Sequence, residues 1–593
     1  MQQDTRNMVV FVIAAVALMM IYQFFVLEPA AKKRDAEAKA AQVQAAALAQ
    51  APTAPKAVVT LTRAQALSQS PRATIDTPSL KGSIALKGAR IDDLWLKRYP
   101  QTLAKNSPPV EFLTPQGTSF AFFADFGWTG SSQAGLPDAN TQWTLAQGSV
   151  LSPGHPLVLT YASPAGLEFT RTLSVDDQYM FTVSDAVVNR GAAAATIIPY
   201  GTVQRHGLPP DTFNAINVHQ GAVGWLDGSL RQSPYKDWKK KGQLDFSGTG
   251  GWAGITDKYW MAAIAPDQKE PVKATFRVTP DQSLDLYDSS YLGQPRTLAP
   301  GQQASETTHL FAGAKTVALL DQYTKTYGIP EMERAVDWGI LRIITRPVFM
   351  VLEFFYQHVG NFGVAILLLT ICMRVLLFWP SHKSYESMTK MKKVQPELEK
   401  IKARFKDDPA KQQQETMAFY QRERINPFLS CFIMLPTIPI FFALYKVLSV
   451  TIEMRHASFL FVPDLSASDP TTIWNLFGLI PFDPTALPLV GGVFGGMLHI
   501  GIWALVYAFT MWLSQSMQPT TGMDQTQKTM MQWMPLLMMF FLARLTVGLL
   551  IYYTWSNLLS IVQQYVIMRR FKVDNPIDSV LNRLSGRPRP APG

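Results

Sequence analysis

The sequence contains little cysteine and little charge. Its 593 residues include 2 cysteines, and Asp, Glu, Lys and Arg together make up 17% of the chain. Cys372 and Cys431 both lie in apolar segments, so they offer neither the spacing of a metal site nor an extracellular disulfide framework. The GxxxxGK[ST] motif of a phosphate-binding loop is also absent from the sequence. These absences argue against cysteine chemistry and against work driven by nucleotide hydrolysis.

Apolar residues are abundant instead, and they are concentrated in long runs. They make up 47% of the chain, which is long enough for several domains. This distribution predicts a multi-pass membrane protein. The first run, residues 8–27, is longer than a signal-peptide core and lacks a small-residue cleavage site after it, so we expect an uncleaved anchor within residues 1–27. Residues 28–57 are rich in Ala, Gln and Lys and predict a linker.

Residues 58–330 change to short segments of alternating apolar residues, separated by Gly, Pro, Asn and Asp. The clearest strand-like stretches are residues 157–163, 167–175 and 180–188, with turn-forming residues between them. This pattern is typical of antiparallel β structure. Over some 270 residues it predicts a large β-sandwich.

The aromatic residues of this β region allow two interpretations. They could line a sugar site, although in a sheet of this size such side chains more often belong to the core or the rim. A membrane-tethered carbohydrate enzyme is therefore one alternative, with Asp211, Asp257 and Asp285 as available carboxylates, but nothing in the sequence places two of them at catalytic separation. The tryptophans concerned are Trp95, Trp128, Trp143, Trp225, Trp252 and Trp260.

The remainder of the chain is predicted to be helical and largely within the membrane. Residues 331–358 are interrupted by charged side chains and predict an amphipathic helix at the interface. Residues 359–571 form the predicted membrane core, and together with the N-terminal anchor it gives six transmembrane α-helices. The five core spans are expected at residues 360–380, 428–449, 493–514, 530–545 and 547–567.

Basic residues predict the orientation of these spans. Residues 381–425 carry eleven Lys or Arg against seven acidic residues, which predicts a cytoplasmic loop. Both termini are then cytoplasmic, including the basic tail 572–593, and residues 28–335 lie outside. The cluster of Lys32, Lys33 and Arg34 after the anchor disagrees, but long loops translocate largely regardless of their charge.

The cytoplasmic loop 381–425 predicts a helical hairpin. A turn is expected at KDDP, where Asp408 can cap and Pro409 can begin a second helix that reaches about Arg424. The basic face of the hairpin is either an ordinary solvated surface or a docking site for an acidic partner such as ribosomal RNA. The first helix carries one apolar stripe made of Met388, Met391, Val394, Leu398, Ile401 and Phe405.

Arg374 interrupts the apolar run of residues 362–379. An arginine at the centre of a transmembrane helix costs about 2.5–3.5 kcal/mol, so such a residue usually faces water, a partner or a substrate. A second interpretation is snorkelling, because Trp379 follows only five residues later and a long side chain can reach the nearer interface. The run by itself leaves both interpretations open.

Four stretches of the chain are similar to a known family. QRERINPF ends the hairpin, LPTIPIFFALYKVL follows in the next span, and QSMQPTTGMDQTQKTMMQWMP and GLLIYYTWSNLLSIVQQYVIMRR come later. With the β domain and Arg374, they resemble the YidC/Oxa family of membrane-protein insertases, in its Gram-negative form. The resemblance implies a multidomain protein of the bacterial inner membrane. Its fold would be a five-helix core with an N-terminal anchor, a periplasmic supersandwich-like β domain and a cytoplasmic hairpin.

The resemblance also implies a mechanism and a set of residues. Members of the family receive hydrophobic segments of nascent membrane proteins in a hydrophilic groove that is open to the cytoplasm and to lipid, alone or with the Sec translocon. No cofactor or covalent reaction is implied, and the expected partners are nascent chains, the Sec translocon, the ribosome through the hairpin and tail, and membrane lipids. The groove residues would be Arg374, Thr370, Tyr553 and Thr437, and the apolar slide would comprise Cys431, Leu435, Pro439, Met534, Pro535 and Met538.

Some positions depart from the family pattern. Thr437 stands where some relatives carry glutamine, Arg544 is an addition in the turn between the last two spans, and residues 471–493 make the outer loop longer. A secondary transporter is a further alternative, because it too can place a charge within a span. Such transporters usually contain paired repeats with broken helices, and the sequence shows no internal duplication.

Overall fold

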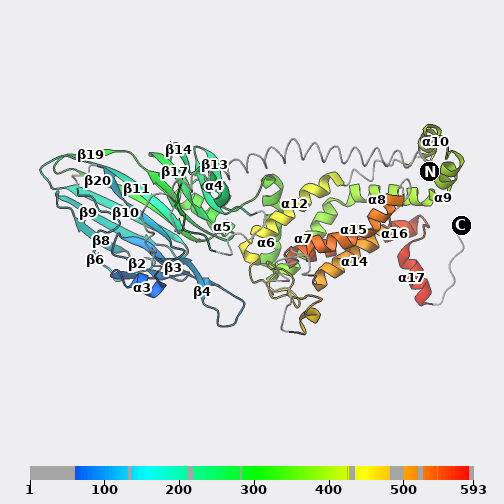
Figure 1. Ribbon diagram of the computed structural model, residues 1–593, viewed down its shortest axis with the longest axis horizontal. Coiled ribbons are helices and arrows are strands. Elements are labelled where there is room, and N and C mark those ends of the chain that lie inside the picture. Colours follow the sequence, from blue (N-terminus) through cyan, green and yellow to red (C-terminus); the bar gives the residue numbers. More distant parts are fainter. Residues whose placement is uncertain are drawn as a thin grey trace, which may run out of the picture.

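The chain is described here from a computed structural model, whose strands gather at one end of the long axis and whose helices gather at the other (Figure 1). The predicted anchor at residues 8–27 and the linker at 28–57 lie outside the described residues. The described residues are 61–130, 135–209, 218–280, 284–423, 425, 434–480, 500–518, 525–543 and 545–585.

The β region forms two sheets. Strands β11 and β18 of one sheet contact β15 and β16 of the other, as expected of a sandwich. The first sheet has the order β14 (Gln243–Thr249), β17 (Pro271–Thr279), β18 (Leu286–Leu292), β11 (Ala195–His206), β5 (Phe122–Gly130), β3 (Arg90–Pro100), β2 (Leu80–Ala85), β1 (Arg72–Asp76) and β7 (Val150–Leu151), with β19 (Arg296–Leu298) beside β11 and β4 (Pro109–Leu113) beside β3. The second has the order β13 (Ser229–Pro234), β12 (Gly221–Leu226), β15 (Trp252–Thr256), β16 (Trp260–Ala265), β20 (Gln303–Ala314), β10 (Met180–Asn189), β9 (Leu167–Val175), β8 (Leu157–Ala162) and β6 (Thr144–Gln147).

The three strands expected from alternation are confirmed. Strands β8, β9 and β10 are consecutive antiparallel neighbours, with Leu157 opposite Leu173 and Phe181 opposite Val175. Along β9, residues at odd positions from Leu167 to Val175 are buried and those between them are not. Period-2 alternation therefore predicted both the strands and the face that each turns toward the core.

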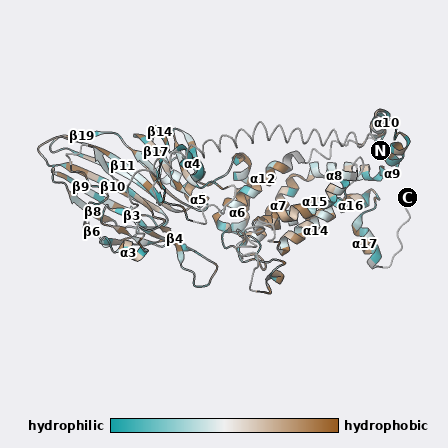
Figure 2. Cartoon of the chain, viewed as in Figure 1, coloured by the Kyte–Doolittle hydropathy of each residue, from teal (hydrophilic) through white to brown (hydrophobic). Residues whose placement is uncertain are grey.

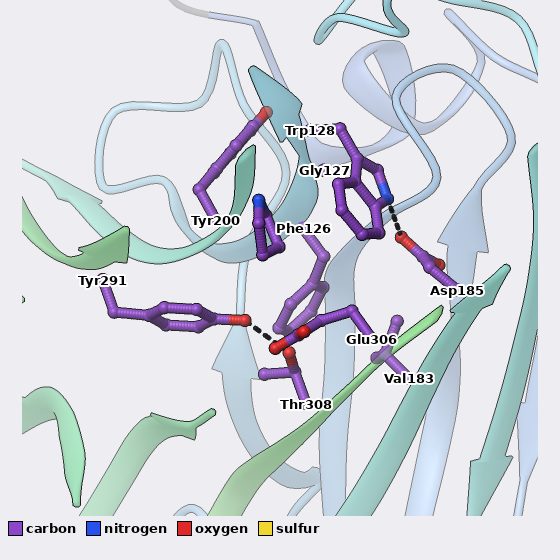
Figure 3. Close-up of a pocket in the computed structure, with 10 residues that line it drawn as sticks. Phe126, Gly127, Trp128, Val183, Asp185, Tyr200, Tyr291, Glu306 and Thr308 are labelled. Atoms are coloured by element: carbon purple, nitrogen blue, oxygen red, sulfur yellow. Dashed lines mark hydrogen bonds between the residues drawn. The ribbon is translucent and has the colours of Figure 1, made fainter. Parts of the chain in front are cut away.

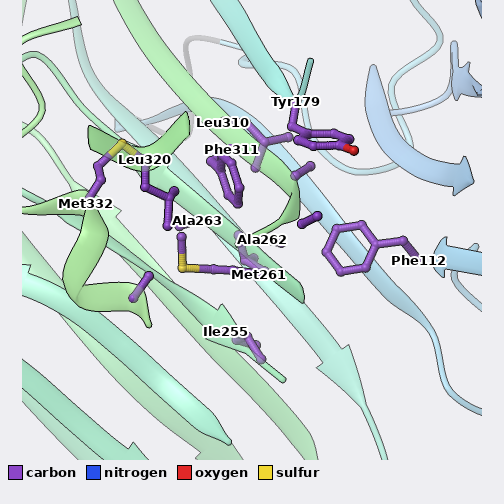
Figure 4. Close-up of a cluster of buried hydrophobic side chains, with 14 of the residues drawn as sticks. Phe112, Tyr179, Ile255, Met261, Ala262, Ala263, Leu310, Phe311, Leu320 and Met332 are labelled. Atoms are coloured by element: carbon purple, nitrogen blue, oxygen red, sulfur yellow. The ribbon is translucent and has the colours of Figure 1, made fainter. Parts of the chain in front are cut away.

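The aromatic residues of the β region are mainly core residues. Trp128, Trp143 and Trp252 are each at most 2% exposed. Figure 4 shows the cluster around Met261 and Phe311, where Leu320 from helix α5 (Val317–Tyr327) packs with residues of the strands. These three of the six tryptophans considered for a sugar site therefore stabilise the sandwich by burial. The other three, Trp95, Trp225 and Trp260, are half-buried.

Short segments connect the sandwich to the helices. Strand β20 leads into α5, then into the 3₁₀ helix η4 (Met332–Ala335) and α6 (Arg342–Val359). The Lys315 ammonium is buried at this junction and donates to the Thr256 hydroxyl and to the carbonyls of Asp257 and Ala335. These bonds attach the connecting segment firmly to the edge of the β domain.

The helices pack around α7 and α16. Helix α6 contacts α7 and α12, α7 contacts α16, and α14 contacts both α15 and α16. Figure 2 shows hydrophobic residues along α7, α14 and α15, and hydrophilic ones on α10. The helices not yet given are α3 (Arg63–Leu67), α4 (Tyr235–Lys241), α7 (Phe362–Leu376), α8 (Phe378–Lys393), α9 (Gln395–Arg404), α10 (Pro409–Arg422), α12 (Met434–Val450), η5 (Ile452–Met454), η6 (Leu476–Gly478), α14 (Ile502–Ser516), α15 (Gln525–Leu542), α16 (Val547–Arg570) and α17 (Pro576–Leu584).

Six transmembrane helices are not confirmed by these elements. Within the described residues, no helix taken singly is both long and apolar enough to cross a bilayer, and only α7 and α8 together meet that measure, with a bend of 68° between them. The span expected at residues 360–380 is thus one helix only as far as Leu376. Each of the other four expected core spans overlaps a helix: α12, α14, α15 and α16.

Residues 381–425 contain the helices of the predicted hairpin, with α9 packed against α10, but the prediction is corrected in detail. Asp408 accepts a hydrogen bond from the Lys411 N–H at 3.1 Å, as the KDDP turn predicts. The single helix expected through residues 388–405 is wrong, because α8 ends at Lys393 and α9 begins at Gln395. Pro396 lies in the first turn of α9 and has no N–H to continue α8, which accounts for the break.

Candidate functional site

Arg374 lies in the last turn of α7 and reaches across to α16. One of its guanidinium nitrogens, Nη2, donates to the Ser556 carbonyl at 2.7 Å and to the Ser556 hydroxyl at 2.6 Å. The side chain is half-buried, and it forms no ion pair with a carboxylate among the residues that the structure describes. The site therefore presents a cation that polar neutral groups hold in place and that no described negative charge neutralises.

The local fold of α7 explains why an arginine is tolerated at this position. The helix starts at Asn361, whose side chain accepts the Val364 N–H at 3.1 Å, and it ends at Leu376. The last turn of a helix exposes unsatisfied carbonyl groups and carries partial negative charge, which stabilises a nearby cation. Trp379, the expected snorkelling landmark, lies beyond the bend and is 71% exposed. The guanidinium bonds to α16.

Thr370, which was expected beside Arg374 in the groove, is fully buried. Its hydroxyl donates to the Ile366 carbonyl of its own helix at 2.7 Å. This intrahelical bond satisfies the hydroxyl without water. In this structure Thr370 contributes to packing and does not share the exposure of Arg374.

Tyr553 lies on α16, where three aromatic residues surround its ring. Phe441 of α12 stacks on it with ring centroids 4.8 Å apart, Tyr507 of α14 lies 6.2 Å away, and Tyr552 lies 5.2 Å away. Tyr553 is 8% exposed, and its hydroxyl has no hydrogen-bond partner among the described residues. A buried hydroxyl without a partner is costly, so this position suits a water molecule or a polar group that arrives with a ligand.

The predicted slide residues are only partly visible. Cys431 lies outside the described residues, and so do the side chains of Leu435 and Thr437 on α12. Pro439, Met534 and Met538 are half-buried, and Pro535 is buried. The large apolar side chains that these two helices expose are neighbours of the predicted ones: Ile438 and Phe442 on α12, and Met530, Trp533, Leu536, Leu537 and Phe541 on α15.

Sequence reasoning missed two residues that define the site. Ser556 holds the guanidinium of Arg374, and Phe441 covers the ring of Tyr553. A usable signal existed for Ser556, because it lies three residues after Tyr553 and therefore on the same helical face. Phe441 gave no such signal, since it lies in a run that is apolar throughout.

The β-sandwich holds a second candidate, a small cavity between the sheets (Figure 3). Its volume of about 10 Å³ has room for a single water molecule. Its carboxylates are engaged: Asp185 pairs with Arg171 at 2.7 Å, and Glu306 pairs with Arg296 at 2.5 Å. A free pair of carboxylates for sugar chemistry is therefore not found here.

The three aspartates weighed for a carbohydrate enzyme do not form a site either. Asp257 is paired with Arg205 at 2.6 Å, and Asp285 is paired with Lys239 at 2.6 Å. Asp211 lies outside the described residues. Within the described part of the chain, no group of three or more His, Cys, Asp or Glu side chains is placed to hold a metal ion.

Comparison with known proteins connects both halves of the chain to one family. Residues 72–351 match the family described as YidC periplasmic domain, and residues 354–575 match the family described as 60Kd inner membrane protein. The membrane protein insertase YidC of Caulobacter vibrioides is 51% identical over 99% of each chain. The protein of the same name from Maricaulis maris is 41% identical, over 99% of this chain and 100% of that one.

The chain belongs to the YidC family of membrane protein insertases. Residues 72–351 accordingly form its periplasmic domain, and residues 354–575 form its inner-membrane part. Among solved structures, the chain is similar to an active YidC insertase crystallised with its first transmembrane domain resolved. That likeness covers 84% of this chain and 94% of the other, with a TM-score of 0.35 and 15% identity, so it carries no further argument.

Membership of the YidC family identifies the protein as an insertase of the inner membrane that acts on nascent membrane proteins. The relatives that match over the full length are named as insertases and not as enzymes. The site around Arg374 lies in the part of the chain that matches the inner-membrane family.

Proposed function

We propose that Arg374 and Tyr553 belong to a hydrophilic groove, open to the cytoplasm and to lipid, that receives hydrophobic segments and promotes their insertion. The observation that carries the proposal is the Arg374 guanidinium, which Ser556 holds through a single nitrogen and which has no carboxylate partner among the described residues. A charge in this condition needs water or a ligand to solvate it.

The physical task of such a groove is to lower the barrier for polar flanks. An apolar segment gains free energy when it leaves water for lipid, so its own transfer needs no fuel. A hydrophilic tail must cross hydrocarbon, where unsatisfied polar groups are costly. Arg374 would attract acidic residues in that tail, and the unpartnered Tyr553 hydroxyl would offer a hydrogen bond next to them.

Release would follow the membrane potential. If the periplasm is positive, each negative charge that crosses the membrane gains about 2.3 kcal/mol for every 100 mV. This gain favours outward translocation of the same acidic tails that Arg374 attracts. Arg374 would thus first attract the acidic residues of the tail, and the membrane potential would then favour their passage across the membrane.

Helices α12 and α15 would supply the apolar side of the path. Both expose large apolar side chains, such as Phe442 and Phe541. Methionines on α15 give a flexible, polarisable surface that suits varied substrates. The proposed slide comprises the predicted residues on these helices together with the exposed neighbours named above.

The basic elements beyond the core would contact partners in the cytoplasm. The hairpin made of α8, α9 and α10 and the tail after Phe571 are proposed to contact the ribosome, with both chain termini on that side. Cooperation with the Sec translocon is part of the proposal. The positive charge of the hairpin is the supporting observation, since it complements an acidic partner such as RNA.

Reconstituted vesicles test the proposal directly. Purified protein should promote insertion of a small single-span protein with an acidic tail, without solute flux and without sugar turnover. Flux alone would favour a transporter, and sugar turnover an enzyme. Photocrosslinking probes at positions 370, 374, 435 and 553 should capture an arrested nascent chain at 374 and 553, whereas a control probe on the β domain at Trp95 should not. Equal capture at all positions would contradict a defined groove.

A further inference from the structure

Helix α17 has an apolar face that the rest of the described chain covers only at its beginning. Residues Ile577, Val580, Leu581 and Leu584 recur at the spacing that places them on one side of a helix, and Asp578, Ser579, Asn582 and Arg583 occupy the other side. Val580 is 55% exposed and Leu581 is 52% exposed. The described part of the chain thus leaves two large apolar side chains of this short helix exposed.

The first turn of α17 is fixed to the end of α16. Asn575 caps the helix by accepting the Asp578 N–H at 2.8 Å, and the Tyr565 hydroxyl donates to Asp578 at 2.8 Å. Arg569 lies 3.5 Å from the same carboxylate. Ile577 packs against the cluster of Met517, Ile561 and Met568 that joins the ends of α14 and α16. The direction of the apolar face is therefore set by contacts with the membrane-family part of the chain.

The orientation of α17 suits an interface. In Figure 1 it runs across the direction of α16, beyond the end of that helix. Ile577 packs against the helix bundle, and Val580 and Leu581, about one turn further along the same face, are exposed. Helix α16 exposes Val562 and Val566 along its last turns, as a lipid-facing surface would.

Positive charge accompanies this apolar face. Arg569 and Arg570 end α16, Lys572 follows, and Arg583 is exposed on α17. Apolar side chains flanked by arginines are the composition of helices that lie at the headgroup boundary of anionic membranes.

We propose that α17 lies on the bilayer surface, with Val580 and Leu581 inserted at the boundary between headgroups and acyl chains and with the arginines bound to anionic lipid headgroups. The proposal rests on the proposed function only for the side of the membrane on which the tail lies. A competing occupant, the same face of a second copy of the chain, is less suited to it, because the arginines of the two copies would repel each other.

Depth-dependent quenching in nanodiscs tests this proposal on the full chain. With Cys372 and Cys431 replaced by serine, a fluorophore is attached at Leu581→Cys or, as the matched control on the opposite face, at Asn582→Cys. Nitroxide-labelled lipid with a shallow spin label should quench the probe at 581 at least about two-fold more than the probe at 582. Nanodiscs expose both leaflets, so the result does not depend on orientation or on insertion activity.

Two further measurements test whether the contact of α17 with the bilayer depends on anionic lipid. Replacing anionic lipid by zwitterionic lipid, or introducing Arg583→Glu, should reduce quenching at 581 in low salt. Equal quenching of the probes at 581 and 582 would overturn the membrane contact. The contact would also be overturned if the probe at 581 differed from the probe at 582 only in nanodiscs that hold two copies of the chain. Quenching at 581 that is indifferent to lipid charge and to Arg583→Glu would overturn the anionic specificity.

Discussion

Lys446 of α12 and Asp337, which follows η4, form an ion pair with 2.6 Å between Nζ and Oδ2. The same carboxylate oxygen accepts the backbone N–H of His219 in the β domain at 2.7 Å. One carboxylate therefore connects a helix of the membrane part, the connecting segment and the sandwich. Both side chains of the pair are largely buried, at 15% and 13% exposure, so removing one partner costs more than it would in a surface ion pair.

Breaking this ion pair should loosen the two halves of the molecule. Asp337→Asn removes the carboxylate charge that pairs with the largely buried Lys446 ammonium, and removing one partner of a buried ion pair costs about 3 kcal/mol. We expect faster limited proteolysis between residues 315 and 341 in detergent, with the β domain itself intact. The double variant Asp337→Asn with Lys446→Met should recover part of the resistance. Unchanged proteolysis in the single variant would show that the pair does not hold the junction.

Substitutions at Arg374 and Ser556 should distinguish the effect of the positive charge from the effect of the hydroxyl group that holds it in place. Arg374→Ala should impair insertion of substrates with charged tails, and Arg374→Lys should retain much of the activity because the charge remains. Ser556→Ala removes only the hydroxyl acceptor at 2.6 Å, while the carbonyl stays in place. We therefore expect a loss of about two- to ten-fold in insertion rate, equivalent to about 0.5–1.5 kcal/mol.

The same assay decides what the arginine does. The insertion rates are compared at equal protein level across several substrates, including one with an uncharged tail as the control. If Arg374→Ala matches the unsubstituted protein on all charged tails, the groove role is wrong and the side chain serves only to anchor α7 to α16.

Removing the Tyr553 hydroxyl should affect stability and function in opposite directions. The hydroxyl has no partner among the described residues, so Tyr553→Phe should leave thermal stability unchanged or raise it by up to about 1 kcal/mol. Insertion should fall, because a polar group is lost from the proposed groove. Tyr553→Ala also removes the stacking on Phe441 and should lower stability by about 3–5 kcal/mol. A clear drop in melting temperature for Tyr553→Phe would mean that the hydroxyl is already satisfied.

His219 should make the junction sensitive to acid. Burial lowers the pKa of His219 to about 4, and its Nε2 donates to the Ala222 carbonyl at 2.9 Å. Nearby Lys315 and Lys446 also oppose protonation, whereas Asp337 favours it. Between about pH 6.5 and pH 4 the unfolded chain binds a proton that the folded chain does not, so stability falls as pH is lowered through this window.

Urea unfolding of the protein measured at several pH values tests this expectation. His219→Gln keeps a donor for the Ala222 carbonyl and removes the titration, so its stability should fall less steeply between pH 6.5 and pH 4. Parallel pH profiles for the two proteins would assign the acid sensitivity to other groups. Above pH 7 the two profiles should run parallel in either case.

Local patterns predicted the elements well where the deciding interactions are local. Alternation predicted β8, β9 and β10, and the KDDP turn predicted the cap at Asp408, because period and capping act over a few residues. The break between α8 and α9 was also signalled by Pro396, but the apolar stripe suggested continuity. Steric restriction at proline prevailed over periodicity there.

Contacts between distant segments were beyond the reach of such patterns. Ser556 lies 182 residues from Arg374, and the sequence gives no spacing that pairs them. The burial of Thr370 likewise follows from the packing of α7 against α6 and α16, since position on the same face as Arg374 did not make it accessible. The groove residues were suggested by family resemblance. The contacts around them depend on the packing of distant segments, which the local sequence does not show.

The bend after Leu376 mechanically couples the hairpin made of α8, α9 and α10 to the site around Arg374. Helix α8 starts two residues after α7 ends and departs at 68°, while it also packs against α16. A force applied at the far end of the hairpin would be transmitted through α8, which packs against α16, to the chain within a few residues of the Arg374 guanidinium. A load applied to the hairpin would thus be transmitted as tension on the hydrogen bonds between Arg374 and Ser556.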